Sequence, residues 1–290
     1  MTRFIMLTLL MSNLFSQTQV VLEEVMFMDA PYVGEIKTTT QKFASKDFFR
    51  QESSLKVDRF IIRMAMGGNK KYGTILDGNS ESRIVYDAEE NKYAFESFDL
   101  IRDNDGKPTL KGMEENMNFG GGSNRRDNNE EETSDDNDKD DESEDDESEE
   151  DVENSIERTI TDETKVIAGL KAKKVITSIK SSERTVLFEE WFTTDTLLIK
   201  FALDKEQELI ESYGGTKTNM PRSFSESMLS QSGQAYDSVE GRLLKYSMQM
   251  KNEDNKGFKM EWELKKIEEI PFNSDDFEVT KKYKKVEKLD

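Results

Sequence analysis

Residues 243–267 read LLKYSMQMKNEDNKGFKMEWELKKI and carry the clearest pattern in the chain. Apolar side chains alternate with polar ones in two runs, 244–250 and 258–264, and a polar connection ending in Gly257 lies between them. Successive side chains of a β-strand point to opposite faces of the sheet, so the alternation predicts a β-hairpin with one apolar and one charged face. Other parts of the chain must cover the apolar face.

The apolar face supplies the candidate binding residues. Its methionine and aromatic side chains either fill a protein core or line a cleft for an apolar ligand, because unbranched methionines adapt to irregular apolar shapes. The candidate ligand-binding residues are Tyr246, Met248, Met260 and Trp262 of the hairpin, with Met64 and Phe188 from neighbouring strands.

Acidic side chains are concentrated in one segment of this 290-residue chain, whose formal net charge is −20. Residues 127–153 hold 18 acids and one Lys, whereas the rest of the chain holds 43 acids and 40 bases. Such a segment cannot bury enough apolar surface to offset its ordering entropy, so we predict a disordered acidic insertion at 112–154. A general nucleic-acid binder is excluded, since phosphate contacts need clustered Lys and Arg.

The segments on either side of the insertion, 17–111 and 155–290, read as sets of short strands with a single apolar face. An insertion of this length is common between two domains. Because each flank has one apolar face to cover, we expect instead that the two flanks form one domain with a shared sheet.

The first 16 residues are typical of a secretion signal, with Arg3 before an apolar run and the small residue Ser16 before the expected cleavage. The apolar run is too short to span a bilayer, and we expect no transmembrane segment elsewhere. Because no Cys follows the signal, we expect no lipid-anchored form. The sequence predicts an exported protein, periplasmic or extracellular, that is soluble after signal cleavage.

The chain contains no Cys and no His. A zinc site of the usual ligands, a thiol nucleophile and an imidazole base are therefore not available, and we expect no catalytic residues, no metal and no cofactor. Carboxylate-pair chemistry, as in glycosidases, remains possible in principle but has no spacing signal behind it.

The remaining pattern is a meander of short strands at hairpin spacing, which favours an antiparallel sheet. Residues 20–28 fit either a first strand or a short helix. The alternation at 57–66 predicts a strand that carries Met64, and further strands are predicted at 92–100 and 197–201. Helices are predicted from Asp204 to Tyr213 and over 225–231.

Three segments together resemble a known family: 163–174 (ETKVIAGLKAKK), 189–192 (EEWF) and 271–286 (PFNSDDFEVTKKYKKV). They are similar to an exported bacterial domain of unknown function on the lipoprotein-carrier (LolA/LolB-like) scaffold, over about residues 35–286. The resemblance implies a mainly β fold, a curved antiparallel sheet that forms an incomplete barrel with a few helices on its open side. In carriers of that scaffold the concave face holds acyl chains. Relatives commonly carry Cys where Ala172 stands, so a thiol or disulfide role of that position is absent here.

Two hypotheses for function follow. The first is a non-enzymatic binding protein that holds a lipid or other apolar molecule on the concave face. The second is a structural or interaction module whose core is filled and whose acidic arm makes ionic contacts with calcium or a basic partner. A carboxylate-based hydrolase is the remaining alternative, and no partner protein is identified.

Overall fold

The computed structural model describes residues 18–65, 68–110, 112, 155–181, 184–216, 223–232, 236–252 and 257–289. The predicted signal sequence and the acidic tract at 127–153 lie outside these residues. Within the described ranges, no helix combines the length and apolarity that crossing a bilayer requires.

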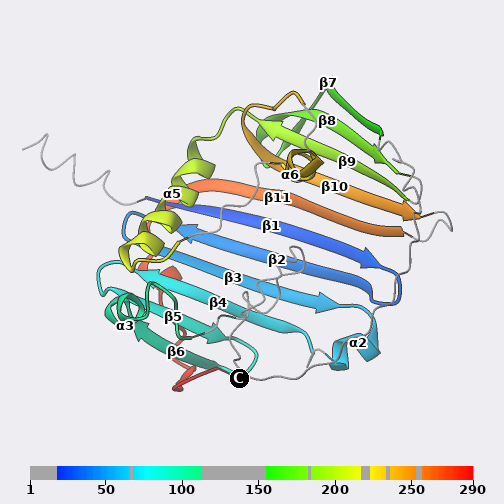
Figure 1. Ribbon diagram of the computed structural model, residues 1–290. Coiled ribbons are helices and arrows are strands. Elements are labelled where there is room, and N and C mark those ends of the chain that lie inside the picture. The colour runs from blue at the N-terminus through cyan, green and yellow to red at the C-terminus, as the bar shows by residue number, and fades with distance from the viewer. Residues whose placement is uncertain are drawn as a thin grey trace, which may run out of the picture.

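Twelve strands form one large, curved and unclosed sheet, which confirms the predicted fold class (Figure 1). Their order across the sheet is β12-β6-β5-β4-β3-β2-β1-β11-β10-β9-β8-β7, and all neighbours are antiparallel except β12 and β6. The strands are β1 (Thr18–Ala30), β2 (Gly34–Ala44), β3 (Phe48–Val57), β4 (Lys70–Asp77), β5 (Ser82–Asp87), β6 (Lys92–Ser97), β7 (Ser155–Ile167), β8 (Leu170–Lys180), β9 (Arg184–Thr193), β10 (Arg242–Asn252), β11 (Gly257–Pro271) and β12 (Lys284–Lys285).

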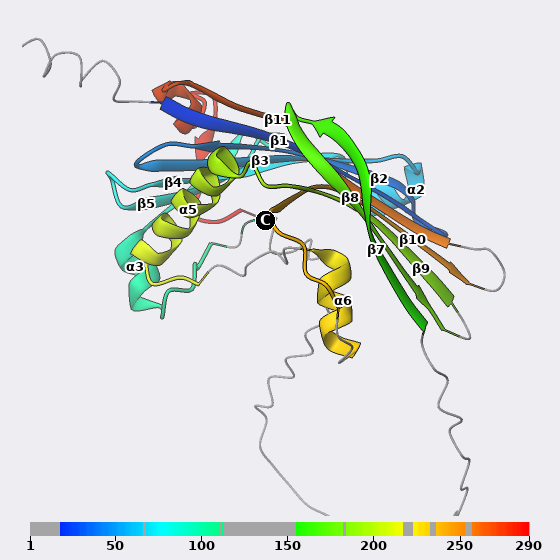
Figure 2. The ribbon, with the colours of Figure 1, turned by 90° about the horizontal axis from the view of Figure 1, so that it is seen from above.

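The helices are α2 (Phe60–Ala65), α3 (Phe98–Asp103), α5 (Leu197–Ser212) and α6 (Phe224–Ser232), with a 3-10 turn η1 (Ser274–Phe277). Figure 2 shows α5 and α6 on the hollow side of the sheet, which we call the concave face. Helix α2 lies at one end of the strands and α3 at the other (Figure 1).

Two meanders build the sheet, and the pairing of β1 with β11 joins them. Strands β1 to β6 follow one another on one side of this pair, and β7 to β11 on the other. The predicted hairpin is confirmed as β10 and β11, with Tyr246 opposite Trp262 and Met248 opposite Met260. Residues 20–28, for which two alternatives were open, lie in strand β1.

The strand predicted at 57–66 is wrong beyond Val57. Strand β2 begins at Gly34 and its last partner in β3 is Val57 opposite Ile36, so the chain has no neighbour left to pair with. It turns instead into α2, where the backbone N–H of Arg63 donates to the carbonyl oxygen of Arg59. Only Ile62 of this helix is packed against the buried cluster of Met28, Ile36, Leu55 and Val57.

The strand predicted at 197–201 is also wrong, and the strand predicted at 92–100 is confirmed as β6 over 92–97 but wrong at 98–100. Strand β9 already has β8 and β10 as neighbours, so residues 197–212 form α5, which buries Ile199, Ala202 and Leu209 at helical spacing. Asp204 lies inside this helix rather than at its start. Strand β6 ends at Ser97, whose hydroxyl caps α3 by accepting from the N–H of Leu100. The helix predicted at 225–231 is confirmed as α6.

A two-residue turn at Ala168-Gly169 joins β7 to β8. Both residues have positive φ, 50° and 82°, which is the backbone geometry that a tight hairpin between right-twisted strands requires. The Ile-Ala-Gly segment of the sequence resemblance is therefore a hairpin corner.

Residues 272–283 cover the convex face of β3 to β6. Phe272 stacks on both Phe277 and Phe48, and the Phe277 ring lies tilted against Phe48. Arg50 Nη1 donates to the carbonyl oxygen of Asp276 at 2.8 Å. The segment is thus held by both apolar and polar contacts.

The same Arg50 belongs to a polar cluster with Glu52 and Tyr86. The Tyr86 hydroxyl donates to Glu52 Oε2 at 2.9 Å, and Arg50 Nη2 pairs with the same oxygen at 2.7 Å. Burial by itself opposes ionisation of Glu52, but the hydrogen bonds and charges of Lys71, Arg50 and Tyr86 outweigh it and lower the pKa of this carboxyl. Gly73 leaves room for the Tyr86 ring, because a Cβ there would lie 2.4 Å from its Cζ.

Replacing Glu52 by Gln should remove a stabilising term that depends on pH. Because the folded-state pKa of Glu52 is lowered, its contribution is present above the unfolded-state pKa of about 4.3 and is lost as the pH falls through the folded-state value. We expect Glu52→Gln to lower the unfolding free energy by about 1–2 kcal/mol at neutral pH. The difference from the unaltered protein should shrink as the pH falls below about 4.

Urea unfolding followed at several pH values measures this difference. Glu268→Gln, which removes the same charge from an exposed ion pair with Lys266, is the control. A difference that stays constant down to acid pH would contradict the assignment.

Candidate functional site

Two rows of side chains cross the concave face, because residues directly opposite each other in an antiparallel pair share a face. The first row crosses six neighbouring strands, β9, β10, β11, β1, β2 and β3, as Phe188, Met248, Met260, Met28, Ile36 and Val57. The second crosses β10, β11 and β1 as Tyr246, Trp262 and Met26. We call these two rows the apolar strip.

Five of the six predicted binding residues thus lie together in the apolar strip: Phe188, Tyr246, Met248, Met260 and Trp262. Met64 does not, because it lies on the outer side of α2 with 65% of its surface exposed. The alternation at 57–66 predicts a strand that carries Met64, but strand β3 ends at Val57, seven residues before it.

Burial varies along the strip. Phe188 at one end and Ile36 and Val57 at the other are at most 2% exposed. In the middle of the strip, Met248, Met260, Met26 and Trp262 are half-buried, whereas Met28 and Tyr246 are buried. Surface that a ligand could contact is therefore concentrated in the middle of the strip.

Helix α6 packs over one end of the second row. The rings of Phe224 and Tyr246 lie 4.1 Å apart between centroids, and Tyr246 in turn stacks on Trp262. Burial, followed by the nearby charge of Glu190, raises the pKa of Tyr246, so its hydroxyl remains neutral at physiological pH.

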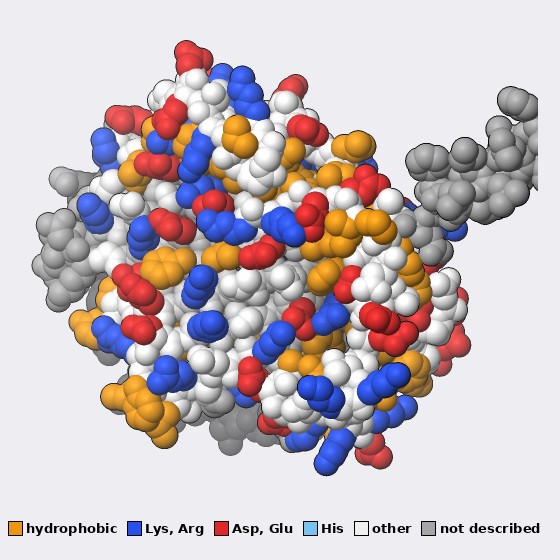
Figure 3. All heavy atoms as spheres, turned by 180° about the vertical axis from the view of Figure 1, so that it is seen from behind, with side chains coloured by type: hydrophobic (Ala, Val, Ile, Leu, Met, Phe, Trp, Pro, Cys, Tyr) orange, Lys and Arg blue, Asp and Glu red, His pale blue; other side chains and the backbone are white. Residues whose placement is uncertain are grey.

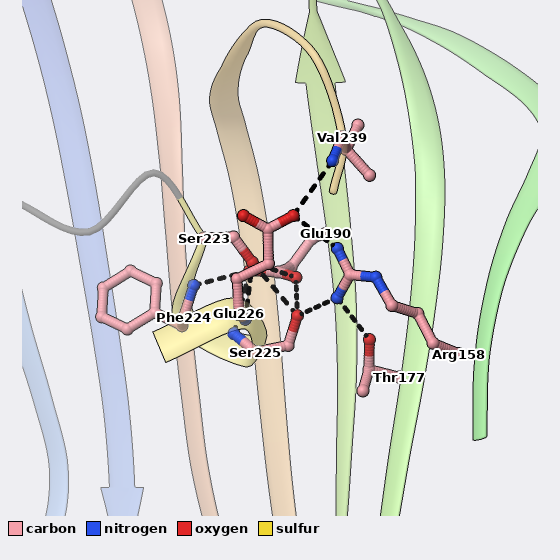
Figure 4. Close-up of polar contacts among 8 residues, drawn as sticks. All are labelled: Arg158, Thr177, Glu190, Ser223, Phe224, Ser225, Glu226 and Val239. Atoms are coloured by element: carbon pink, nitrogen blue, oxygen red, sulfur yellow. Dashed lines mark hydrogen bonds and ion pairs between the residues drawn. The ribbon is translucent and has the colours of Figure 1, made fainter. Parts of the chain in front are cut away.

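A buried carboxylate fixes the start of α6 to the sheet (Figure 4). Glu190 of β9 is fully buried and lies opposite Tyr246. It accepts hydrogen bonds from the hydroxyls of Ser223 and Ser225 and from the backbone N–H of Phe224 at 2.8 Å. A carboxylate at a helix N-terminus satisfies free N–H groups and is favoured by the helix dipole.

Arg158 of β7 completes this buried cluster. Its Nη1 donates to Ser225 Oγ at 2.7 Å and to Thr177 Oγ1 at 3.0 Å, and its Nη2 pairs with Glu226 at 2.9 Å (Figure 4). Glu226 also accepts from the N–H of Val239, which ties the chain after α6 to the same cluster. The polar groups are used to hold α6 in place over the sheet.

The sequence does not predict this cluster. It predicts only a strand around Glu190, whose partners lie 33 to 35 residues further along the chain. One signal was present: Ser223 and Glu226 have the spacing of a capping box, and the Glu226 N–H donates to Ser223 Oγ at 3.0 Å.

Among the residues that the structure describes, no group of three or more acidic side chains is placed to hold a metal ion. The acidic tract on which the calcium hypothesis depends lies outside those residues.

Comparisons with known proteins add the following. No family model matches the chain, and no curated protein matches it. Among solved structures, it is similar to PNGF-II with 11% identity and a TM-score of 0.25, over 93% of this chain and 31% of that protein's length. A DUF1329 family protein from Desulfovibrio piger matches with 12% identity and a TM-score of 0.25, over 94% of each chain. A LolA superfamily protein from Nitrosomonas europaea matches with 10% identity and a TM-score of 0.23, over 91% of this chain and 90% of that one.

A LolA superfamily protein is thus among the solved structures that are similar to this chain. None of these similarities shows what this chain does or what it binds.

Replacing Glu190 by Ala should release α6. The substitution leaves two buried hydroxyls and a backbone N–H without their acceptor and removes a negative charge close to Arg158, so we expect a loss of about 2–4 kcal/mol in unfolding free energy. Limited proteolysis should cut near α6 faster than in the unaltered protein.

Glu189→Ala is the matched control, because Glu189 is the adjacent residue and its ion pair with Lys174 is partly exposed. It should cost about 1 kcal/mol or less. Equal effects of the two substitutions would show that Glu190 does not fix the helix.

Proposed function

We propose that this chain is a non-enzymatic binding protein that holds a lipid or another molecule with a long apolar chain against the apolar strip. The observation that carries the proposal is the first row, six apolar side chains on six neighbouring strands, of which Met248 and Met260 are half-buried and the others are buried. At a strand spacing of about 4.8 Å this row extends over about 24 Å. One acyl chain spans half of a bilayer core of about 30 Å, so the row is long enough for it.

Polar groups border the strip on one side. Next to the second row lie Glu24, Thr40 and Ser53, opposite one another on β1, β2 and β3. Thr40 and Ser53 share a hydrogen bond of 3.0 Å, and Glu24 pairs with Lys42 at 2.9 Å. An amphiphile could therefore lay its chain on the strip and direct its polar head toward these hydroxyl and charged groups.

A filled core is the competing interpretation of the strip. It accounts for the buried ends, where Phe188, Ile36 and Val57 are almost inaccessible. It does not account for the half-buried methionines in the middle, which retain apolar surface that a ligand would remove from water. The proposal rests on this difference along the row.

Trp262 should report directly on the ligand. The chain contains two Trp residues, so Trp191→Phe leaves Trp262 as the only indole. A brominated fatty acid added to this variant should quench Trp262 fluorescence strongly, because bromine quenches an indole that it contacts.

The complementary variant, Trp262→Phe, retains only Trp191, which lies in the core cluster beneath α5. Its fluorescence should change little. Equal quenching in the two variants, or none in either, would place the ligand elsewhere. Mass spectrometry of lipids extracted from the purified protein identifies what is bound.

A charge in the middle of the strip should abolish tight binding. Met248→Asp places a carboxylate against the apolar chain, and we expect the fatty-acid affinity to fall at least about tenfold. Gln249→Asp adds the same charge one position later, on the opposite face of β10, and should leave the affinity within about twofold. Circular dichroism checks that both variants are folded. Unchanged binding by a folded Met248→Asp variant would rule out the strip as the site.

A further inference from the structure

Four large apolar side chains are exposed together at one end of the sheet. They are Tyr32, Phe60, Ile61 and Met64, which are exposed by 78, 62, 79 and 65%. Tyr32 lies in the turn between β1 and β2, and the other three lie in α2. Figure 3 shows apolar side chains gathered at this end of the molecule, at the lower left of the view. We call these four residues the apolar tip.

The turn and the helix are packed together as one unit. Arg59 Nη1 donates to the carbonyl oxygen of Tyr32 at 2.9 Å. The side chain of Arg59 also lies against Gly34, where an added Cβ would come within 2.8 Å of it. The four apolar residues are therefore held at fixed positions relative to one another.

Tyr32 has an unusual backbone for an exposed aromatic residue. Its φ is +71°, and the turn is closed by a 3.2 Å hydrogen bond from the N–H of Val33 to the carbonyl oxygen of Ala30. With Pro31 at the second position, the third position of such a turn usually carries Gly, because a side chain there is strained. A bulky ring retained in a strained and exposed position indicates a role outside the fold itself.

Positive charges border the apolar tip. The guanidinium of Arg63 lies 5.6 Å from the centre of the Phe60 ring. Between residues 56 and 70, four of the described residues are basic (Lys56, Arg59, Arg63 and Lys70) and one, Asp58, is acidic, although the whole chain has a net charge of −20. Two further acids, Asp29 and Glu35, lie on the strands behind the turn.

We infer that the apolar tip docks on the surface of an anionic lipid bilayer. Exposed apolar side chains with cations beside them are the combination by which short segments bind at a lipid–water interface, since the apolar groups enter the acyl boundary and the cations contact anionic headgroups. Charge complementarity thus selects an anionic bilayer as the occupant of this surface.

The inner side of α2 adds a reason for docking at this place. Ile62 packs against Met28, Ile36, Leu55 and Val57, three of which belong to the first row of the apolar strip. A molecule that moves between the bilayer and the strip therefore has its shortest apolar path beside α2. This second part of the inference rests on the proposed function.

Vesicle flotation of the purified protein tests the docking. The protein should float with vesicles of phosphatidylglycerol and phosphatidylethanolamine, and much less with vesicles of phosphatidylcholine alone. The double variant F60S/I61S should lose at least about tenfold in partition, because it removes two of the exposed apolar side chains. Arg63→Gln should lower binding to the anionic vesicles by about fivefold and leave binding to the neutral vesicles unchanged.

The double variant L100S/L197S is the matched control. Leu100 and Leu197 are exposed by 58 and 77% and lie in α3 and α5, at the opposite end of the sheet (Figure 1). This variant should float as the unaltered protein does. No flotation of the unaltered protein, or an equal loss in both double variants, would overturn the inference.

Two further measurements separate this inference from its alternatives. Sedimentation at several concentrations measures whether the unaltered protein and the F60S/I61S variant form dimers. A dimer that is present in the unaltered protein and lost in the variant would overturn bilayer docking in favour of a contact between copies of the chain.

Lipid extracted from the same preparations tests the proposed function independently. A variant that keeps its lipid but no longer floats supports docking by the tip, whereas unaltered protein that floats without any bound lipid contradicts the proposed function alone.

Discussion

The antiparallel pairing of β1 with β11 joins the two meanders into one sheet. Each meander alone would leave a long edge strand with unpaired N–H and C=O groups. Pairing Thr18 to Asp29 with Lys259 to Pro271 satisfies both edges and makes one sheet. It also places Met26 and Met28 beside Trp262 and Met260, so the apolar strip is continuous only when the two meanders are joined. Fold and candidate site are therefore formed by the same contact between segments far apart in the sequence.

The helices cover the concave face by two different means. Helix α5 packs through an apolar core that includes Leu22, Phe49 and Leu264, which gives stability without demanding one exact orientation. Helix α6 is positioned by the buried charges of Glu190 and Arg158, whose hydrogen bonds are directional. Because a buried charge is costly unless its partners stay in place, this cluster favours a single position of α6 over the strip.

Much of the fold could be predicted from the sequence, because period-two alternation is a direct consequence of strand geometry. The hairpin at 243–267, the antiparallel meander and the apolar face follow from it, and five of the six candidate residues lie where that face is. Short apolar runs such as 60–65 and 197–201 fit a strand or a helix equally well. What decides them is whether a neighbouring strand is free to pair, and the local sequence does not contain that information.

The buried cluster at α6 shows the other limit. Ser223 and Glu226 signal a helix start, but no pattern in the sequence shows that a strand carboxylate 33 residues earlier reaches the same helix terminus. Strand alternation places Glu190 on the same face as Phe188 and Phe192, but the local sequence does not contain the partners that bury its charge, which are Ser223, Ser225 and the start of α6. Its burial is a property of the tertiary arrangement alone.

The composition of the strip bears on what it would bind. Its ends are stiff, with an aromatic ring at Phe188 and β-branched side chains at Ile36 and Val57 that have few rotamers. The middle of its first row consists of Met248, Met260 and Met28, whose unbranched side chains adjust to different shapes at little cost. A site with rigid ends and an adaptable middle discriminates chains by their length more than by bends along them. A row built for one rigid ligand would instead need branched or aromatic side chains at the three positions where this row has methionines.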